Sequence, residues 1–138
     1  MSVVRTTALT AAVTAACALA AAGNAEAAAQ YYGTIAVSKI RNAAVVSTDR
    51  SKVSADADAI RDCASYDCTL VLHFTDGCGA VAQGADGTFG WAAAGSRDEA
   101  EQAAITGLGQ SNPPFPDLGS ASPQAAHIVA SACTPNIQ

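Results

Sequence analysis

The hydrophobic residues of this chain fall into short segments separated by polar or glycine-containing turns. Each segment is five to eight residues long and rich in Ala, Val, Ile or aromatic residues, a pattern typical of β-strands. The predicted strands cover residues 32–37, 43–47, 68–75, 79–83, 88–93 and 126–132. Between two of them, Asp86-Gly87 supplies the backbone with positive φ that a tight hairpin needs, and Asn42 stands at the matching place in the first hairpin.

Two alanine-rich segments have the helical period instead, with apolar residues at i, i+4, i+5 and i+8. These positions form one helical face, which we expect to pack on a sheet. They are Ala55, Ala59, Ile60 and Cys63 in the first segment and Ala100, Ala104, Ile105 and Leu108 in the second. Ser96 and Glu99 form a capping box at the start of the second helix, and Ser51 is a weaker N-cap for the first.

The elements occur twice in the same order. Ser51–Ile60 aligns with Ser96–Ile105 at an offset of 45, with four of ten positions identical. The first strand of each copy fits the same alignment at an offset of 46. We therefore predict an α+β fold, with a small antiparallel sheet and two helices, stabilised by disulfides. It is built from two β-β-α-β repeats, residues 32–78 and 79–133, with a pseudo-two-fold relation.

The N-terminal segment differs from the rest of the chain. Arg5 precedes an apolar run from Ala8 to Ala22, and small residues at 25–29 offer cleavage sites. The run is short and weakly hydrophobic for a membrane anchor. We expect residues 1–29 to be a cleaved signal peptide and residues 30–138 to form one secreted domain, located outside the cell or in its envelope.

Four of the five cysteines lie outside this leader, which contains Cys17. An even number of cysteines in a small exported domain indicates disulfides, and their spacing does not fit a zinc site. Cys63 and Cys68 have no counterparts in the second copy, and their joint absence favours a bond between them. Cys78 and Cys133 end the two copies and would then bond across the pseudo-two-fold relation.

The second copy contains a proline-rich insertion at residues 110–123, where four prolines exclude a helix or a central strand. We predict a surface loop with Phe115 exposed on it. Phe115, Tyr31 and Tyr32 are the candidate interaction surface, whereas Trp91 is predicted to lie in the core.

The chain has seven basic and twelve acidic residues and a net charge of −5, which Arg5 and Glu26 in the leader do not change. An acidic domain without a basic cluster is a poor partner for nucleic acid or anionic lipid. We expect neither a nucleic-acid partner nor a stable membrane anchor, and a homodimer is compatible with the composition. Asp56, Asp58 and Asp62 read as a solvated helix face rather than a carboxylate pair.

The sequence predicts no catalytic, metal-binding or cofactor-binding residue. His73 lies in an apolar predicted strand on the face opposite Leu72, where it would be exposed or would pair with Asp76. His127 lies similarly in the last strand. Since no nucleophile motif accompanies either histidine, we favour a structural role for both.

The chain resembles a family of small secreted actinobacterial proteins, many of them mycobacterial, known only as a domain of unknown function. The residues that carry this resemblance are Tyr32-Gly-Thr-Ile-Ala-Val-Ser38, Ala55-x-x-x-Ala59-Ile60-x-x-Cys63, Cys68-Thr-Leu-Val-Leu72 and Cys78-Gly79-Ala80. The resemblance implies an exported α+β domain with duplicated strand-strand-helix units and paired cysteines, and it carries over no catalytic residues.

Export, small size and the absence of a catalytic pattern favour a non-enzymatic domain that binds an unknown protein partner. A small secreted hydrolase or envelope-modifying enzyme that uses His73 or His127 is the alternative. A protease inhibitor that presents the insertion at 110–123 as its binding loop is a second alternative.

Overall fold

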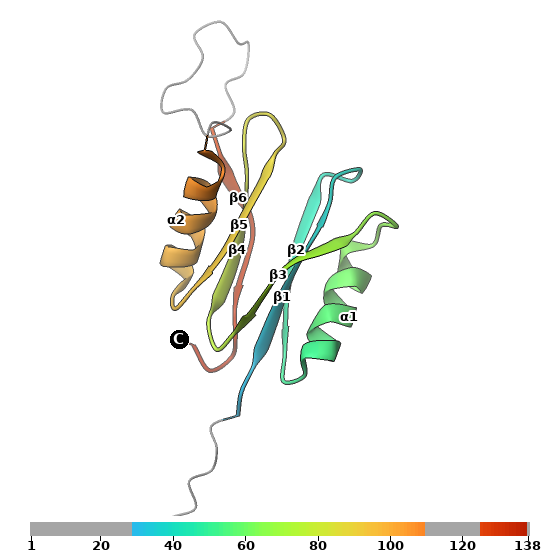
Figure 1. Ribbon diagram of the computed structural model, residues 1–138, viewed down its shortest axis with the longest axis vertical. Helices are drawn as coiled ribbons and strands as arrows, with labels where there is room; N and C mark the ends of the chain where they lie inside the picture. Colours follow the sequence, from blue (N-terminus) through green and yellow to red (C-terminus); the bar gives the residue numbers. More distant parts are fainter. Residues whose placement is uncertain (1–28, 110–124, 138) are drawn as a thin grey trace, which may run out of the picture.

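A computed structural model describes residues 29–109 and 125–137 of the chain (Figure 1). The signal peptide predicted for residues 1–29 and the insertion at 110–123, including Phe115, thus fall almost wholly outside the described residues. The elements are β1 (Tyr32–Ser38), β2 (Ala43–Asp49), α1 (Lys52–Cys63), β3 (Thr69–Thr75), β4 (Cys78–Gln83), β5 (Phe89–Ala94), α2 (Arg97–Gly107) and β6 (His127–Cys133).

The strands form two antiparallel three-stranded sheets, ordered β2-β1-β3 and β5-β4-β6. The α+β class with two helices and disulfides is confirmed, with the strands divided between two sheets. Figure 1 shows these sheets facing each other, with α1 on the outer face of the first and α2 on the outer face of the second. We call β1, β2, α1 and β3 the N-terminal half, and β4, β5, α2 and β6 the C-terminal half.

The two halves match residue by residue along their central strands. Tyr32 on β1 pairs with Thr75 on β3, and Cys78 on β4 pairs with Cys133 on β6. Each of these pairings is interrupted once, between Ile35 and Ala36 in the first sheet and between Val81 and Ala82 in the second. Both interruptions fit an offset of 46 between β1 and β4. A residue of β1 is therefore equivalent to the residue 46 positions later on β4, and their partners on β3 and β6 are equivalent to each other.

Phe74 joins the two sheets. Its ring lies in the core between them with Ile35, Val37 and Val81. A Cβ atom added at Gly33 on β1 would lie 2.0 Å from the ring, and one added at the equivalent Gly79 on β4 would lie 2.4 Å from it. The two glycines thus leave the space that one aromatic ring from β3 fills.

The inner faces of the helices are lined mainly by alanine, as predicted. Ala55, Ala59 and Cys63 of α1 are buried, and so are the equivalent Ala100, Ala104 and Leu108 beside α2. The prediction for Ile60 was wrong, since its side chain is 40 % exposed. Ile60 lies at the margin of the buried face, and the three smaller side chains fill the contact with the sheet.

The predicted turns and caps are present. Asn42 and Gly87 both have positive φ, 53° and 82°, at equivalent places in the two hairpins. The Ser51 hydroxyl accepts a hydrogen bond from the Ser54 N–H, and the Ser96 hydroxyl accepts one from the Glu99 N–H. Each half therefore starts its helix in the same way.

The structure joins Cys63 to Cys68 and Cys78 to Cys133, the two pairs that the sequence favours. The position expected for the second bond was wrong, because it does not cross between the halves. Cys78 is the first residue of β4 and Cys133 the last of β6, so this disulfide links two neighbouring strands of the second sheet. Each half thus has one internal disulfide, at different places.

The prediction that Trp91 lies in the core was also wrong, since its side chain is 40 % exposed. Trp91 lies on β5, an edge strand of its sheet, where one flank of the indole has no neighbouring strand to cover it.

Candidate functional site

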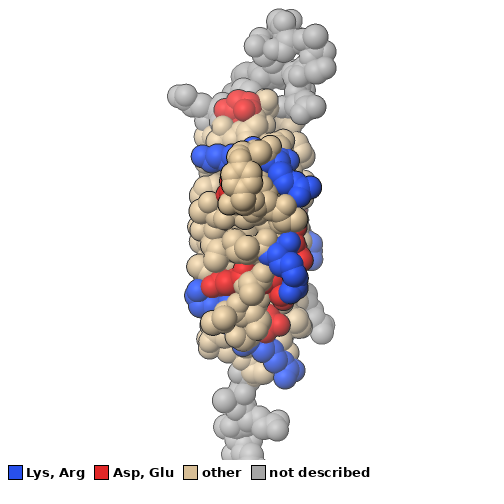
Figure 2. All heavy atoms as spheres, turned by 90° about the vertical axis from the view of Figure 1, so that its right-hand side faces the viewer, with Lys and Arg blue, Asp and Glu red and all other residues tan. Residues whose placement is uncertain are grey.

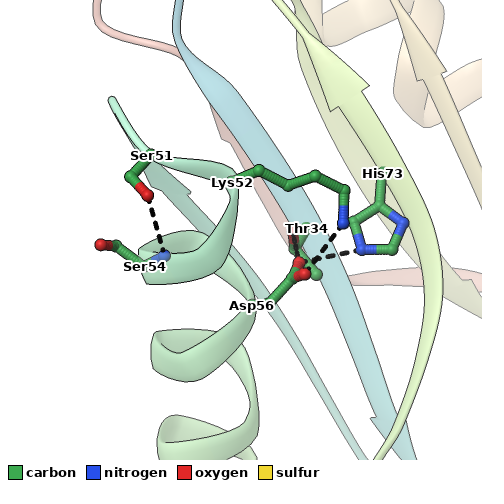
Figure 3. A network of polar contacts seen from close by, with 6 residues as sticks. All are labelled: Thr34, Ser51, Lys52, Ser54, Asp56 and His73. Carbon is green, nitrogen blue, oxygen red and sulfur yellow. Dashed lines mark hydrogen bonds and ion pairs between the residues drawn. The ribbon is translucent and has the colours of Figure 1, made fainter.

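A polar network connects α1 to its sheet around the carboxylate of Asp56 (Figure 3). Thr34 on β1 donates a hydrogen bond of 2.6 Å to Asp56 Oδ1. His73 Nε2 on β3 lies 2.9 Å from the same oxygen, and Lys52 Nζ lies 2.9 Å from Oδ2. Thr34 and His73 are register partners in the sheet, so one helix carboxylate holds two strands.

Burial raises the pKa of Asp56, but its hydrogen bonds with Thr34 and Lys52 and the nearby charges of His73 and Lys52 lower it more. The pKa therefore lies below its ordinary value of 3.8. The sequence position of Asp56 suggested a solvated helix face. This expectation was wrong, since its side chain is only 24 % exposed. Asp58 and Asp62 do lie toward solvent, where both contact Arg61.

His73 is exposed, which is one of the two alternatives that the sequence left open, whereas the other, a pairing with Asp76, was wrong. Strand alternation turns the imidazole toward α1 and Asp56, as Figure 3 shows, whereas Asp76 follows the end of β3. The Asp76 carboxylate instead accepts hydrogen bonds from Tyr31 N–H and the Asn136 amide. His127 begins β6 in the other sheet, so the fold does not bring the two histidines together.

The C-terminal half contains a similar but smaller arrangement, since Ala80 stands where the first half has Thr34. Glu101 on α2 is equivalent to Asp56, and it accepts a hydrogen bond of 2.7 Å from Ser131, the equivalent of His73 on β6. Arg97, equivalent to Lys52, donates to the Ser131 carbonyl and hydroxyl. We call each of these helix-to-sheet networks a clamp. The first consists of Thr34, Lys52, Asp56 and His73, and the second of Arg97, Glu101 and Ser131.

The second half makes the corresponding helix-to-sheet connection through Ser131, so this connection does not require a histidine. His73 Nε2 contacts Asp56 Oδ1, the same oxygen that accepts the Thr34 hydroxyl. Among the residues that the structure describes, no three side chains of His, Cys, Asp or Glu gather as a metal site. No helix in the described ranges is long and apolar enough to cross a membrane.

A second feature lies on the outer face of α1 and is apolar. Val53, Ala57, Ile60 and Ala64 follow one another at helical spacing, and Tyr66 lies just beyond the end of the helix. Val53 is 77 % exposed and Tyr66 is 91 % exposed. Figure 2 views the molecule from this side, where Lys and Arg atoms border a column of uncharged atoms and Asp and Glu atoms lie mainly in its lower half. We call these five residues the α1 column.

The turn between β1 and β2 continues this surface at the end of the helix. The Asp67 carboxylate accepts hydrogen bonds from the Ser38 and Ser65 hydroxyls and from the Ile40 N–H. These bonds hold the pKa of Asp67 far below its usual range. Arg41 donates to the Ala64 carbonyl at 2.7 Å, so the turn and the connector after α1 are fixed against each other.

The equivalent face of α2 is polar in its first two turns, whereas Ile105 stands where α1 has Ile60. Asp98 stands where α1 has Val53, and Gln102 stands where α1 has Ala57. All four of these residues are exposed, so the scaffold does not require apolar side chains there.

The family model described as Domain of unknown function (DUF4189) matches residues 32–133, which include both halves and both disulfides. The chain belongs to this family. No curated protein and no solved structure matches the chain.

The α1 column of this DUF4189 domain was not predicted from the sequence, although a signal for it was present. In the alignment of the two copies, Val53 and Ala57 correspond to Asp98 and Gln102, at helix positions outside the predicted buried face. Tyr31 and Tyr32, which the sequence offered as interaction residues, lie at the start of β1. Arg50 lies 5.5 Å from the Tyr31 ring centroid, and the Tyr32 hydroxyl donates to Gln30.

Proposed function

We propose that this DUF4189 domain is a secreted, non-enzymatic binding domain that acts in the cell envelope or outside the cell, and that it contacts a protein partner through the α1 column. The leader sequence and the two disulfides support export. The observation that carries the proposal is the exposure of Val53, Ile60 and Tyr66 on one face.

Single exposed hydrophobic residues are common, but contiguous apolar surface that the fold does not need indicates an interaction site. The α2 face provides an internal comparison, because an equivalent helix on an equivalent sheet has Asp98 and Gln102 where α1 has Val53 and Ala57. Tyrosine and arginine are enriched in protein interfaces, and Tyr66 has Arg41 and Arg61 on the neighbouring segments. A protein partner therefore fits this surface.

The clamp supports a non-enzymatic function. The Asp56 carboxylate joins the His73 ring, Lys52 and the buried Thr34 hydroxyl, which is the arrangement expected of a structural link between helix and sheet. The serine at the equivalent place in the second half makes the same structural connection. The clamp thus supports a structural role for His73 and Asp56.

Site-specific photo-crosslinking tests the proposal. Benzoylphenylalanine is introduced at Ala57 in one version of the secreted protein and at the equivalent Gln102 in another. We expect discrete protein adducts from position 57 in the producing cells and their medium, and none from position 102. An excess of unlabelled native protein should suppress the adducts.

The matched competitor is V53D/A57Q, which gives α1 the residues that α2 has. We expect it to compete at least about tenfold less well than native protein, which corresponds to about 1.4 kcal/mol of binding energy. Equal adducts from positions 57 and 102, or equal competition by V53D/A57Q, would contradict a binding function for the α1 column.

Export has its own measurement. N-terminal sequencing of the protein recovered from the medium should find a chain that starts at Ala28 or Gln30, after one of the small-residue sites. A cell-retained chain that starts at Met1 would contradict this part of the proposal.

A further inference from the structure

We propose that the N-terminus of the exported chain is a modification site, at which Gln30 cyclises to pyroglutamate with the help of the Tyr32 hydroxyl. This inference rests on the proposed export, because it needs the leader to be removed after Ala29. It goes beyond the proposed binding function, since it concerns neither the α1 column nor a protein partner.

The reaction needs only a glutamine at the N-terminus. Cleavage between Ala29 and Gln30 turns the backbone nitrogen of Gln30 into a free α-amino group. In its uncharged form, this nitrogen attacks the side-chain amide carbon Cδ of the same residue and closes a lactam ring of N, Cα, Cβ, Cγ and Cδ. The bond from Cδ to the side-chain nitrogen breaks, and that nitrogen takes one proton from the attacking amine and leaves as ammonia. No oxidant, reductant or second substrate is consumed.

The fold fixes the chain directly after Gln30. The Tyr31 N–H donates to Asp76 Oδ1 at 3.0 Å, and the Asp76 N–H donates to the Tyr31 carbonyl at 3.0 Å. Gln30 itself is exposed, so the core does not enclose the reacting residue. Gln30 thus reacts from a defined position, and its ring closure costs less entropy than it would at a loose chain end.

The Tyr32 hydroxyl lies at the oxygen on which charge develops. Tyr32 is the first residue of β1, and its hydroxyl donates a hydrogen bond of 2.9 Å to Gln30 Oε1, the oxygen of the reacting amide. When the α-amino nitrogen attacks Cδ, this oxygen becomes negatively charged. A donor that is already in place stabilises that charge, so Tyr32 acts as the oxyanion donor of the reaction.

The modification protects the place where the two ends of the domain meet. Asp76 also accepts a hydrogen bond of 2.7 Å from the Asn136 amide, so one residue holds both the start of β1 and the segment after β6. Figure 1 shows these two segments at the same end of the molecule. Aminopeptidases need a free α-amino group, and loss of Gln30 and Tyr31 would remove both backbone bonds to Asp76. A pyroglutamate ring blocks this trimming.

The first experiment measures the mass of the native protein recovered from the medium. Intact mass spectrometry, followed by fragmentation of the N-terminal peptide, shows where the chain starts and whether ammonia has been lost. We expect most molecules to start at residue 30 and to lack one molecule of ammonia. An added aminopeptidase should leave this N-terminus unchanged.

Q30N is the matched control for the ring. Asparagine keeps the amide but is one carbon shorter, so the corresponding ring is strained and should not form. The mass of Q30N should match the uncyclised chain, and the aminopeptidase should shorten this variant.

The role of Tyr32 is tested by the rate of cyclisation. The chain from residue 30 onward is released in vitro from a fusion protein cut directly before Gln30, and the loss of ammonia is followed over time. Y32F should cyclise several-fold more slowly than native protein. Y31F should cyclise at the native rate, because the Tyr31 hydroxyl accepts from Arg50 and the backbone bonds of residue 31 to Asp76 remain. Thermal unfolding checks that both variants are folded.

The outcomes separate this inference from the proposed export. A chain that starts at Ala28, or one that starts at Gln30 and keeps its free amine, would overturn the inference while still supporting export. A cell-retained chain that starts at Met1 would overturn both. Equal rates for native protein and Y32F would overturn the role of Tyr32.

Discussion

The two halves of this domain differ on the outside far more than on the inside. Both have the same strand order, an interruption of register at the same place, an alanine-lined helix and a clamp between helix and sheet. Outside, α1 has Val53 and Ala57 at two exposed positions, with charged residues of both signs beside them, whereas α2 has Asp98 and Gln102 at the equivalent positions. Features that both halves share serve the fold, and a feature that one half alone has is a candidate for function.

The largest expected difference between the halves concerns their disulfides. In the chain-entropy description, a bond that closes a longer loop constrains the unfolded chain more. C78S/C133S, which opens a loop of 55 residues, should cost about 4 kcal/mol, and C63S/C68S, with a separation of 5, about 2 kcal/mol. Urea denaturation of the two double variants measures both; equal losses would contradict this ranking.

The glycines beside Phe74 should be equally sensitive in both halves. G33A and G79A each place a methyl group into the ring, and we expect each to lower the free energy of unfolding by about 3 kcal/mol. The control is G107A, since a Cβ there meets no atom within 4 Å. A loss in only one of the two variants would show that Phe74 packs against one sheet alone.

The clamps should differ moderately, because Asp56 has more partners than Glu101. D56N should cost about 2 kcal/mol and E101Q about 1 kcal/mol at neutral pH, as judged from urea denaturation. H73S, which copies the second half, should cost less than D56N.

The clamp also predicts the direction of a pH effect. The pKa of Asp56 is lowered in the folded state, so its contribution is fully present above the ordinary value of 3.8 and is lost as the pH falls below it. The stability difference between wild type and D56N should therefore shrink in acid between pH 3.8 and the lower folded pKa. A difference that grows on acidification would contradict this assignment.

The smallest expected effect on stability lies on the outer faces. V53D/A57Q should change the free energy of unfolding by less than about 0.5 kcal/mol, since Val53 and Ala57 are exposed and an Asp near the start of a helix interacts well with its dipole. A loss above about 1 kcal/mol would mean that the α1 column belongs to the core, and the comparison with α2 would lose its functional meaning.

Much of the fold could be predicted from the sequence because local signals agreed with one another. Strand segments, capping serines and the two turn residues Asn42 and Gly87 each have a local physical cause. The division of the strands into two sheets has no such local cause. After β3 the chain turns through Asp76, with φ 46°, and Gly77, and β4 enters the opposite sheet. That choice depends on how Phe74 packs between sheets.

The candidate site was harder to predict, since it depends on register. Alternation placed His73 on the correct side of its strand, but the contact with Asp56 needs the position of α1 over β1 and β3 and the irregular pairing near Val71. No local pattern encodes these distances. The α1 column, by contrast, could have been found by comparing the outward positions of the two aligned helices.

The position of Phe74 has a consequence for how the protein is made. Synthesis delivers the N-terminal half first, and until β4 follows, one face of its sheet, with Ile35, Val37 and the Phe74 ring, has no covering layer. A chain that ended before β4 would therefore expose this apolar face to solvent, and the second half covers it.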